Sequence, residues 1–509
     1  MSVPYYNPVE LWAMPPDHFN EWRSKNDLPL LLAFFRERLP AFQKWLDQFG
    51  IDEEIFCRTA STGQFFIGAG KKVIVEEPRD NDKFVFYRYW KITKERLEQV
   101  AKEKGRPVLK HKEFEPYFYW AKKNLGRKRY FSPDKNNRAV TDTFLFNGWE
   151  APDVKEASRA ILMRDFRVLK LGGITLGQNH RVDGRNLDFA DLDYLSIKGD
   201  YHGSWGAEIN FSSCRRMEFK NASLHHFNIR QCNLDEFTCI GSKLQRFGFE
   251  KCRSLNSRFI NSDIFMVSFI EYGVLPQFDK CDLQEVIFEP DRNFPPYAIS
   301  NQYRRLRVAY QDAGKRHEAS QNYYLERQYE RKALFNPYFE PDKQGSFPSA
   351  IFHANISNIF DAWWKKDISG LNAIKYALMA FLFHLKIWLN PKYLPKTLYF
   401  KLKYFSSLFQ EILWGYGEYP SRVLWIAIGA IITYAYVYYV SFLGLKPVFS
   451  VDDRFINSIY FSVVTFTTLG YGDILPNTSN LKIVCGSEAL VGAFLIGMVI
   501  AGFSNKNKY

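Results

Sequence analysis

A short segment near the carboxyl end of the chain, residues 468–473 (TLGYGD), has the residue types needed to present main-chain oxygens to a metal ion. A segment of this kind needs residues that let consecutive carbonyls point the same way, and glycine reaches positive φ without a Cβ clash. Gly470 and Gly472 supply that freedom, and Thr468 adds a hydroxyl at the inner end. Four such segments around one axis would stack rings of oxygen that replace the hydration shell of a potassium ion. The expected permeant ion is K⁺, held by the backbone of Thr468, Leu469, Gly470 and Tyr471, and no cofactor is expected.

The surrounding residues 462–476, SVVTFTTLGYGDILP, resemble the pore loop of potassium channels with two membrane helices per subunit, of the inward-rectifier and bacterial type. The resemblance implies a selectivity filter in a homotetramer, supported by Thr467 and Asp473 at its ends. Leu469 departs from the commonest family signature, which has valine there, and its side chain is expected to face away from the ions. A G-Y-G tripeptide taken alone is equally compatible with a turn.

The elements beside this segment have to hold it at membrane depth. Residues 453–467 predict an apolar helix of about 15 residues, shorter than the roughly 20 that cross a hydrocarbon core. Such a helix must re-enter, since irregular backbone at this depth is tolerated only inside protein or along a water-filled cavity. Residues 423–445 and 483–503 are long and apolar, and they are predicted to be the outer and inner membrane helices.

Three residues of the predicted inner helix are candidates for a role in the pore. Glu488 is its only ionisable residue, and an acid inside a span is costly. It either bonds to the back of the pore loop and supports the filter, or stays protonated and is merely tolerated. Gly492 and Gly497 are candidates for a gating hinge, although small residues also let membrane helices pack closely.

Basic residues favour an orientation with both termini in the cytoplasm of a multi-pass cell-membrane protein. The basic residues either precede the first predicted span or follow the second: Lys396, Lys401, Lys403, Arg422, Lys506 and Lys508. No apolar helix carries arginine at every third position, so voltage gating is not expected. Few residues follow Phe503, which places the expected regulation on the amino-terminal side, through an unknown cytoplasmic ligand or protein.

A period of five dominates the region before the spans. From Ile209 to Phe269 every fifth residue is usually large and apolar, and a small residue often stands two positions before it. Neither a helix nor a strand has this period. The pattern resembles the pentapeptide-repeat family, which implies a right-handed square β-solenoid whose coils bury their apolar sides only against one another. Residues 187–197 and 278–288 continue the series out of phase.

The charge of the repeat region argues against one function that such repeats can have, mimicry of a DNA duplex. Residues 181–290 contain 13 basic and 16 acidic residues, whereas a mimic would be far more acidic. Nucleic acid is therefore not expected as a partner, and the solenoid is interpreted as a scaffold or an inter-subunit spacer.

Two helical segments are expected between the repeats and the spans. Residues 300–334 predict an amphipathic hairpin with its turn at 312–314, with Leu306, Ala309 and Tyr310 on one face and Ala319, Tyr323 and Tyr324 on the other. Residues 373–389 and 396–414 are apolar and carry scattered lysines, which is typical of helices in the membrane interface. A buried hairpin of a soluble domain is the alternative for these two segments.

The first 165 residues are consistent with a small α+β domain. Strands are expected at 64–67, 72–75 and 84–89 and a helix at 93–104. Residues 68–71 (GAGK) lack the spacing of a phosphate-binding loop. The basic run Lys122, Lys123, Arg127, Lys128 and Arg129 is either a ligand site or a solvated face.

The sequence as a whole predicts a multidomain membrane protein with five regions. These are an α+β cytoplasmic domain (1–165), the β-solenoid (166–295), the helical hairpin linker (296–340), a linker with interfacial helices (341–420) and an all-α two-helix pore domain with its re-entrant loop (421–509). Membrane lipids and other copies of the chain are the expected partners. A weakly selective cation channel and a membrane-tethered interaction scaffold are the alternatives. The chain shows no paired carboxylates, metal cluster or nucleophile at a recognisable spacing, and its seven scattered cysteines fit a reducing cytosol.

Overall fold

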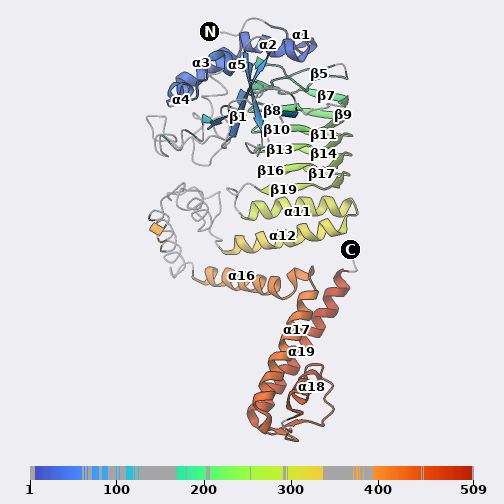
Figure 1. The fold of residues 1–509 in the computed structure, drawn as a ribbon. Helices are drawn as coiled ribbons and strands as arrows, with labels where there is room; N and C mark the ends of the chain where they lie inside the picture. Colours follow the sequence, from blue (N-terminus) through green and yellow to red (C-terminus); the bar gives the residue numbers. More distant parts are fainter. Residues whose placement is uncertain are drawn as a thin grey trace. The chain divides into compact units, whose positions relative to one another are not determined.

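The computed structural model of the chain describes most of residues 6–59, 72–89, 111–117, 169–290, 296–335 and 394–506, with single positions between these segments. The described residues form two compact units, Met1–Phe294 and Pro295–Tyr509. The first unit contains helices, a small sheet and a β-solenoid, and the second contains a helical hairpin and the long apolar helices (Figure 1).

Short parallel strands build the solenoid and confirm the predicted fold. One ladder has the order β19-β16-β13-β10-β8 and another the order β17-β14-β11-β9-β12-β15-β18. Ile229 pairs with Phe249 and Phe249 pairs with Phe269, so one coil holds 20 residues, which is four repeats of five. The strands are β4 (Leu169–Lys170), β5 (Thr175–Leu176), β6 (Ala190–Asp191), β7 (Ser196–Tyr201), β8 (Ala207–Asn210), β9 (Glu218–His225), β10 (Phe227–Arg230), β11 (Thr238–Ile240), β12 (Lys243–Gln245), β13 (Gly248–Glu250), β14 (Arg258–Ile260), β15 (Asp263–Phe265), β16 (Ser268–Tyr272), β17 (Gln277–Asp279), β18 (Asp282–Gln284) and β19 (Ile287–Pro290).

The five-residue period of the sequence is the period of the corners. The backbone reaches positive φ at every fifth residue along much of the solenoid, as at Arg216, Asn221 and His226. Each of these residues lies two positions after a central residue, as Asn221 does after Phe219. Each repeat therefore supplies one short extended stretch and one corner, and four corners close a coil.

Two irregular coils explain why the repeats change phase. Ile197 pairs with Phe219, which is two residues more than the regular coil length. Phe259 pairs with Phe278, which is one residue fewer. The apolar side chains of Ile197, Phe219 and Phe259 are nevertheless buried, so the change of phase leaves the interior intact. Part of the first irregularity lies inside β7, where the register shifts between Lys198 and Gly199.

The interior combines stacked aromatic rings with small polar groups. The ring centroids of Phe249 and Phe269 lie 5.1 Å apart in stacked planes. On another face, Ser242 Oγ accepts a bond of 3.1 Å from the main-chain N–H of Ala222, and Ser262 Oγ accepts one of 3.2 Å from that of Ser242. The small residues of one coil thus satisfy main-chain donors of the preceding coil.

Short helices and a three-stranded sheet account for most of the described part of residues 6–117, as the α+β prediction required. The aromatic core of the helices includes Trp45, Phe35 and Phe56, and it extends to Phe189 and Phe211 of the solenoid. The helices therefore cover the first coil, which would otherwise expose its apolar interior. The helices are α1 (Pro8–Ala13), α2 (Pro16–Asn26), α3 (Leu28–Arg38), α4 (Phe42–Phe49) and α5 (Glu53–Arg58), and the antiparallel sheet has the order β2-β1-β3 with β1 (Lys72–Arg79), β2 (Lys83–Tyr89) and β3 (His111–Phe114).

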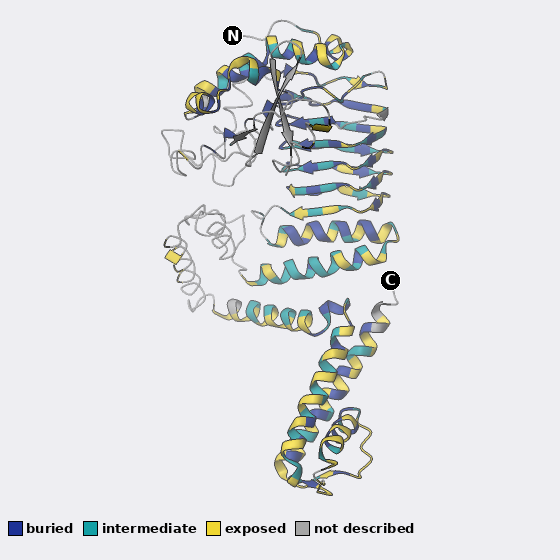
Figure 2. Cartoon of the chain, viewed as in Figure 1, coloured by how far each residue is buried: buried dark blue, intermediate teal, exposed yellow. Residues whose placement is uncertain are grey.

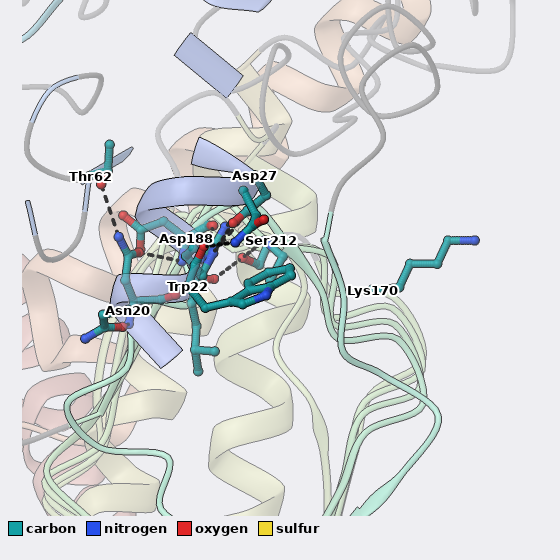
Figure 3. A network of polar contacts seen from close by, with 12 residues as sticks. Asn20, Trp22, Asp27, Thr62, Lys170, Asp188 and Ser212 are labelled. Carbon is teal, nitrogen blue, oxygen red and sulfur yellow. Dashed lines mark hydrogen bonds and ion pairs between the residues drawn. The ribbon is translucent and has the colours of Figure 1, made fainter. Parts of the chain in front are cut away.

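A buried polar network joins α2 to the first coil (Figure 3). Arg23 pairs with Asp27 at 2.6 Å and donates to the main-chain oxygens of Asn186 and Asp188 at 2.6 and 2.9 Å. The Asp188 carboxylate accepts bonds from Asn210 Nδ2 at 2.7 Å and from the main-chain N–H of Gly63 at 2.6 Å. Burial raises the pKa of the Asp188 carboxyl to about 6.

The strand prediction for residues 64–67 is wrong at Phe66, which is helical. Its ring is fully buried and stacks on Phe56 at 5.3 Å, so packing in the aromatic core, which a period-two reading of the sequence ignores, holds this residue. The strands predicted at 72–75 and 84–89 are confirmed by β1 and β2. Within the predicted helix at 93–104 the described positions 99, 102 and 103 are helical. The GAGK segment and the five residues of the basic run lie outside the described residues.

The second unit begins with the predicted hairpin. Helices α11 (Pro296–Asp312) and α12 (Arg316–Phe335) are joined at Gly314, whose φ of 71° ends the first helix. Leu306, Ala309, Tyr310 and Ala319 are buried, whereas Tyr323 and Tyr324 are half-buried. The sequence did not predict the buried Glu326 of α12, which pairs with Arg304 and Arg307 of α11 at 2.8 Å each.

Apolar helices complete this unit. Residues 396–414 belong to one helix, and of the segment 373–389 the described positions 374, 375, 378 and 382 are helical. The outer helix is shorter than predicted, because the chain turns after Val440 and Leu445–Lys446 pairs with Leu475–Pro476. The elements are α16 (Leu394–Trp414), the 3₁₀ turn η2 (Gly415–Gly417), α17 (Ser421–Val440), the 3₁₀ turn η3 (Phe442–Gly444), β20 (Leu445–Lys446), α18 (Arg454–Phe466), β21 (Leu475–Pro476) and α19 (Ser479–Lys506).

Candidate ion-conduction site

Helix α18 is too short to cross a membrane and packs against two helices that are long enough. Its 13 residues extend roughly 20 Å at 1.5 Å per residue, against a hydrocarbon core of about 30 Å. Helices α17 and α19 are long and apolar enough to span, and both contact α18 (Figure 1). The loop that contains α18 therefore leaves and rejoins the pair of spans at one end.

The carboxyl end of α18 closes in a Schellman motif. The main-chain N–H of Thr468 donates to the oxygen of Thr465 and that of Leu469 to the oxygen of Val464, both at 3.0 Å. Thr468 has a φ of 56° in this motif, where glycine is usual. A β-branched residue at positive φ is strained by about 1–3 kcal/mol, and such strain persists where the surroundings over-determine it.

Positive φ alternates along the segment that follows. Thr468, Gly470 and Gly472 have φ values of 56°, 55° and 78°, whereas Leu469 and Tyr471 are not among the residues with positive φ. In a chain that is not helical, such an alternation of φ turns successive carbonyls toward one side. The segment also starts at the negative end of the α18 dipole, which favours a cation.

Polar contacts hold both ends of the segment. Thr467 Oγ1 donates to the main-chain oxygen of Val463 at 2.7 Å, one turn back in α18. Asp473 Oδ2 accepts a bond of 2.7 Å from the Tyr460 hydroxyl of α18, and Asp473 Oδ1 accepts one from the main-chain N–H of Ile474. Both predicted supporting residues thus have a defined partner near the segment.

Glu488 lies between all three helices of the domain and is fully buried. Its Oε1 lies 2.5 Å from Ser462 Oγ on α18, and its Oε2 accepts a bond of 2.6 Å from the Tyr438 hydroxyl on α17. Tyr438 also packs against Phe461 of α18 with ring centroids 4.7 Å apart. The acid of the inner helix therefore bonds to the rear face of α18, four residues before that helix ends.

Gly492 and Gly497 have different surroundings. A Cβ at Gly492 would overlap the main-chain carbonyl of Phe466, at the end of α18. A Cβ at Gly497 would meet nothing within 4 Å. The contact at Gly492 favours close packing of α19 against α18, which is the alternative to the hinge.

The sequence did not single out Ser462, Tyr438 or Tyr460, although each bonds to a candidate residue. A signal for Ser462 exists, because Ser458 and Ser462 stand four residues apart in an otherwise apolar helix and both are buried. No comparable spacing marks Tyr438 or Tyr460, since their partners are distant in sequence. Their roles depend on the packing of three helices.

Comparison with known proteins agrees with this geometry. Residues 423–508 match the family described as ion channel, which covers α17, α18 and α19. A segment of 30 residues is 60% identical to Two-pore potassium channel 4 of Arabidopsis thaliana. That segment is 6% of this chain and 11% of the plant protein. The carboxyl-terminal part of the chain is thus an ion channel domain with two candidate membrane spans.

Proposed function

We propose that the chain is the subunit of a homotetrameric, potassium-selective channel in the cell membrane. The observation that carries the proposal is the alternation of positive φ at residues 468–472, immediately after the re-entrant helix. Carbonyls turned to one side can replace the hydration shell of K⁺ when several chains surround one axis. The short match to a plant protein named as a potassium channel supports the same ion.

A single chain leaves this segment uncovered, which supports assembly around an axis. The side chains of Leu469 and Tyr471 are 61% and 68% exposed in one subunit. Large apolar side chains that are exposed in a re-entrant loop are expected to pack against other protein, because only packed side chains can hold the backbone of a filter in one conformation. Neighbouring copies of the same loop supply it in the proposed tetramer.

The test compares two glycines that have similar free space for a Cβ but different backbone conformations. A Cβ at Gly470 or at Gly429 of α17 meets nothing within 4 Å in one subunit, but only Gly470 has positive φ. An L-residue at such a φ costs about 1–2 kcal/mol, so Gly470→Ala should tilt the carbonyls and lower K⁺ over Na⁺ selectivity, while Gly429→Ala should not. Reversal potentials of the purified protein in bilayers, with K⁺ on one side and Na⁺ on the other, measure this.

Three results would contradict the proposal. A wild-type reversal potential near zero indicates the weakly selective cation channel, and the absence of any current indicates the membrane-tethered scaffold. Equal selectivity in both glycine variants would mean that the carbonyls of this segment do not select the ion.

We also propose that the amino-terminal part gates the pore through the hairpin. Support comes from a set of bonds between α12 and Glu411 of α16, whose side chain is mostly buried. Glu411 Oε1 accepts bonds from the Tyr324 hydroxyl at 3.0 Å and from Gln328 Nε2 at 2.5 Å, and its carboxylate pairs with Arg331. The main-chain oxygen of Glu411 accepts a bond of 3.0 Å from Arg422 of α17. A displacement of α12 therefore reaches the first span through Glu411, and also through Tyr324, whose ring lies against Tyr419 and under the Arg422 guanidinium.

A further inference from the structure

The backbone that leaves the ion-selecting segment, residues 468–473, is paired with the chain that follows the outer helix. The segment itself is exposed throughout in one subunit (Figure 2). Directly after it, β21 (Leu475–Pro476) pairs antiparallel with β20 (Leu445–Lys446), which follows α17 after the short turn η3. The main-chain N–H of Asn477 also donates to the main-chain oxygen of Gly444 at 2.8 Å. We name the two strands together with this bond the β20–β21 ladder.

The sequence fits the register of this ladder. Bonded and non-bonded pairs alternate along antiparallel strands, so the bonded pair of Gly444 and Asn477 is followed by a non-bonded pair and then by another bonded one. Pro476, which has no N–H, lies opposite Leu445 at the non-bonded position, where the ladder needs no donor. A shift of the register by one residue would place proline where a donor is required.

The buried face of the ladder joins all three helices of the pore domain to the exit of the segment. Leu445 is fully buried in a cluster with Tyr438 of α17, Phe461 of α18 and Leu481 of α19. Ile474, the residue directly after the segment, belongs to the same cluster. A shift of the backbone at Ile474 therefore requires a shift of Leu445, and with it of the chain that leaves the outer helix.

The same end of α17 also holds the start of α18. Arg454, in the first turn of α18, donates to the main-chain oxygen of Tyr439 at 2.6 Å, and its guanidinium carbon lies 3.7 Å from the ring centroid of Phe442. A hydrogen bond from a charged donor is stronger than a neutral one, and the ring adds a cation–π contact. Both ends of the re-entrant loop, its start at Arg454 and its exit at the ladder, are therefore attached to residues 439–446.

The exit of the segment has to resist a force that its own oxygens create. Carbonyl oxygens that face one axis repel one another when no cation lies between them, because each carries a partial negative charge. The inner end of the segment is continuous with α18 through the Schellman motif, whereas the outer end depends on the bonds of Asp473 and on the ladder. A bound cation and the ladder therefore act in the same direction.

We propose that the β20–β21 ladder positions the outer end of the ion-selecting segment, so that the loop end of α17 determines how long the segment keeps its conducting form when K⁺ leaves. Gly444, Leu445 and Asn477 are positioning residues, since they act through the backbone of the segment and not on the ion. This inference rests on the proposed potassium-selective pore. It adds a second point, besides the hairpin, from which α17 acts on conduction.

The first arm of the test locks the ladder reversibly in the full-length protein. Lys446 and Leu475 are paired and both are exposed, so cysteines at these positions leave the buried cluster intact. Residues of a bonded antiparallel pair have Cα atoms about 5.5 Å apart, a separation that a disulfide spans. The double variant Lys446→Cys, Leu475→Cys is therefore expected to form a disulfide within one chain on oxidation. The two single variants are the controls, and the unsubstituted protein gives the background of its native cysteines, six of which are buried.

The measurement is the loss of conduction after K⁺ is withdrawn. Both chambers of a bilayer set-up are perfused with a bulky organic cation in place of K⁺, and the fraction of current that returns with K⁺ is recorded against the time without it. The oxidised double variant should lose current about two- to tenfold more slowly than the same protein after reduction, the range in rate that one net hydrogen bond corresponds to. The single variants should lose current at one rate in both conditions.

The second arm weakens the ladder. Asn477→Pro removes the N–H that donates to Gly444, and Asn477→Ala, which keeps it, is the matched control because the exposed side chain is lost in both variants. The proline variant should lose current faster than the wild type, and the alanine variant should not. A small residual K⁺ concentration should slow the loss in the proline variant, which a general defect of the fold would not do.

Two outcomes overturn the proposal alone. Equal rates of loss in the oxidised and reduced double variant, with the disulfide confirmed on a non-reducing gel, would mean that the ladder does not hold the segment. A disulfide that fails to form, or that joins two chains, would mean that positions 446 and 475 are not paired within one subunit. If Asn477→Pro does not assemble, the disulfide arm decides by itself. A wild-type reversal potential near zero would instead contradict the potassium-selective pore, and this inference with it.

Discussion

At the scale of single residues, the hydrogen bonds around Glu488 have more acceptor oxygens than hydrogen atoms if its carboxylate is ionised. Ser462 Oγ carries one hydrogen and lies 2.9 Å from the main-chain oxygen of Ile431 and 2.5 Å from Glu488 Oε1. It can donate to only one of these oxygens. A protonated Glu488 donates to Ser462 Oγ and accepts from Tyr438, so every group is satisfied, whereas an ionised one leaves two acceptors for one hydrogen. The two sequence interpretations of Glu488, support for the filter and protonation, are therefore compatible.

Substitution of Glu488 tests this assignment. Gln at position 488 retains one donor and one acceptor, so Glu488→Gln should keep both ion selectivity and the thermal stability of the assembled protein. Glu488→Ala should lose stability by about 1–3 kcal/mol for each buried group left without a partner. Thermal unfolding and reversal potentials of the same preparations measure the two effects. A Gln variant as damaged as the Ala variant would show that the carboxylate is ionised.

Asp188 provides a pH-dependent contribution to stability in the first unit. Burial raises the pKa of the Asp188 carboxyl from 3.8 to about 6, although the hydrogen bonds from Asn210 and Gly63 lower it. The charge of Glu208 raises this pKa further, and the Arg23 guanidinium lowers it. The native state therefore binds more protons than the unfolded state between these values. Stability is fully present below about pH 4 and falls by about 3 kcal/mol as the pH rises through 6.

Hydrogen exchange of the strands nearest Asp188 in the full-length protein measures this loss from pH 4 to pH 7. Asp188→Asn should reduce the slope, because the side chain at 188 then no longer titrates. Asp263→Asn is the control, since that carboxylate is 62% exposed. An identical slope in the Asp188 variant and the control would exclude Asp188 as its source.

At the scale of elements, the close approach of α18 and α19 determines what Gly492 can do. No side chain fits between Gly492 and the main chain of Phe466. Closeness at this point brings Glu488, one turn earlier in α19, into reach of Ser462. Helix α18 is therefore held against α19 at two neighbouring points, the close approach of Phe466 to Gly492 and the buried bond between Ser462 and Glu488.

Gly492→Ala should separate the two interpretations of this glycine. If it is a packing residue, a Cβ forces α19 away from α18, and the assembled protein should dissociate at a lower temperature. Gly497→Ala, where the space is open, should leave dissociation unchanged. Size-exclusion chromatography after heating measures the assembled fraction. Normal heat resistance together with an altered open probability in Gly492→Ala would favour the hinge instead.

At the scale of the whole molecule, the proposed gating depends on the contacts of Glu411, which joins the hairpin helix α12 to α16 and to Arg422 of α17. A double-mutant comparison tests this connection: Glu411→Gln removes the pairing with Arg331, and Arg331→Met removes it from the other side. Both variants should shift the open probability in the same direction, and combining them should add little, because each breaks the same link. Selectivity should stay unchanged in all three proteins.

Glu330→Gln is the matched control for that comparison, because among the described residues Glu330 pairs with Arg304 and Arg327, both of the hairpin. Single-channel recordings give the open probability. A control that changes gating as much as Glu411→Gln does would mean that hairpin stability, and not its link to α16, is what the pore responds to.

Much of this architecture follows from the sequence because its signals are local. The period of five repeats along the solenoid, and each repeat contributes the same corner, so the pattern survives an insertion and a deletion. The re-entrant helix is predictable from its length and its apolar composition. The partners of Glu488 were not predictable, since Tyr438 lies 50 residues away and reaches it only when α17 packs against α19.

The tripeptide Gly-Tyr-Gly occurs twice and shows where local information ends. At residues 415–417 all three φ values are positive and the chain turns a corner, whereas at residues 470–472 only the glycines are positive. Identical residues permit both conformations, because glycine adopts positive φ without strain. Tyrosine at positive φ is strained and needs surrounding contacts, such as the bond of 3.1 Å between Tyr416 and Ser407. The sequence alone determined that two such segments exist and which one follows a short apolar helix. The packing around each segment decided its backbone conformation. The reason is that turn conformations differ in energy by less than the surrounding contacts contribute.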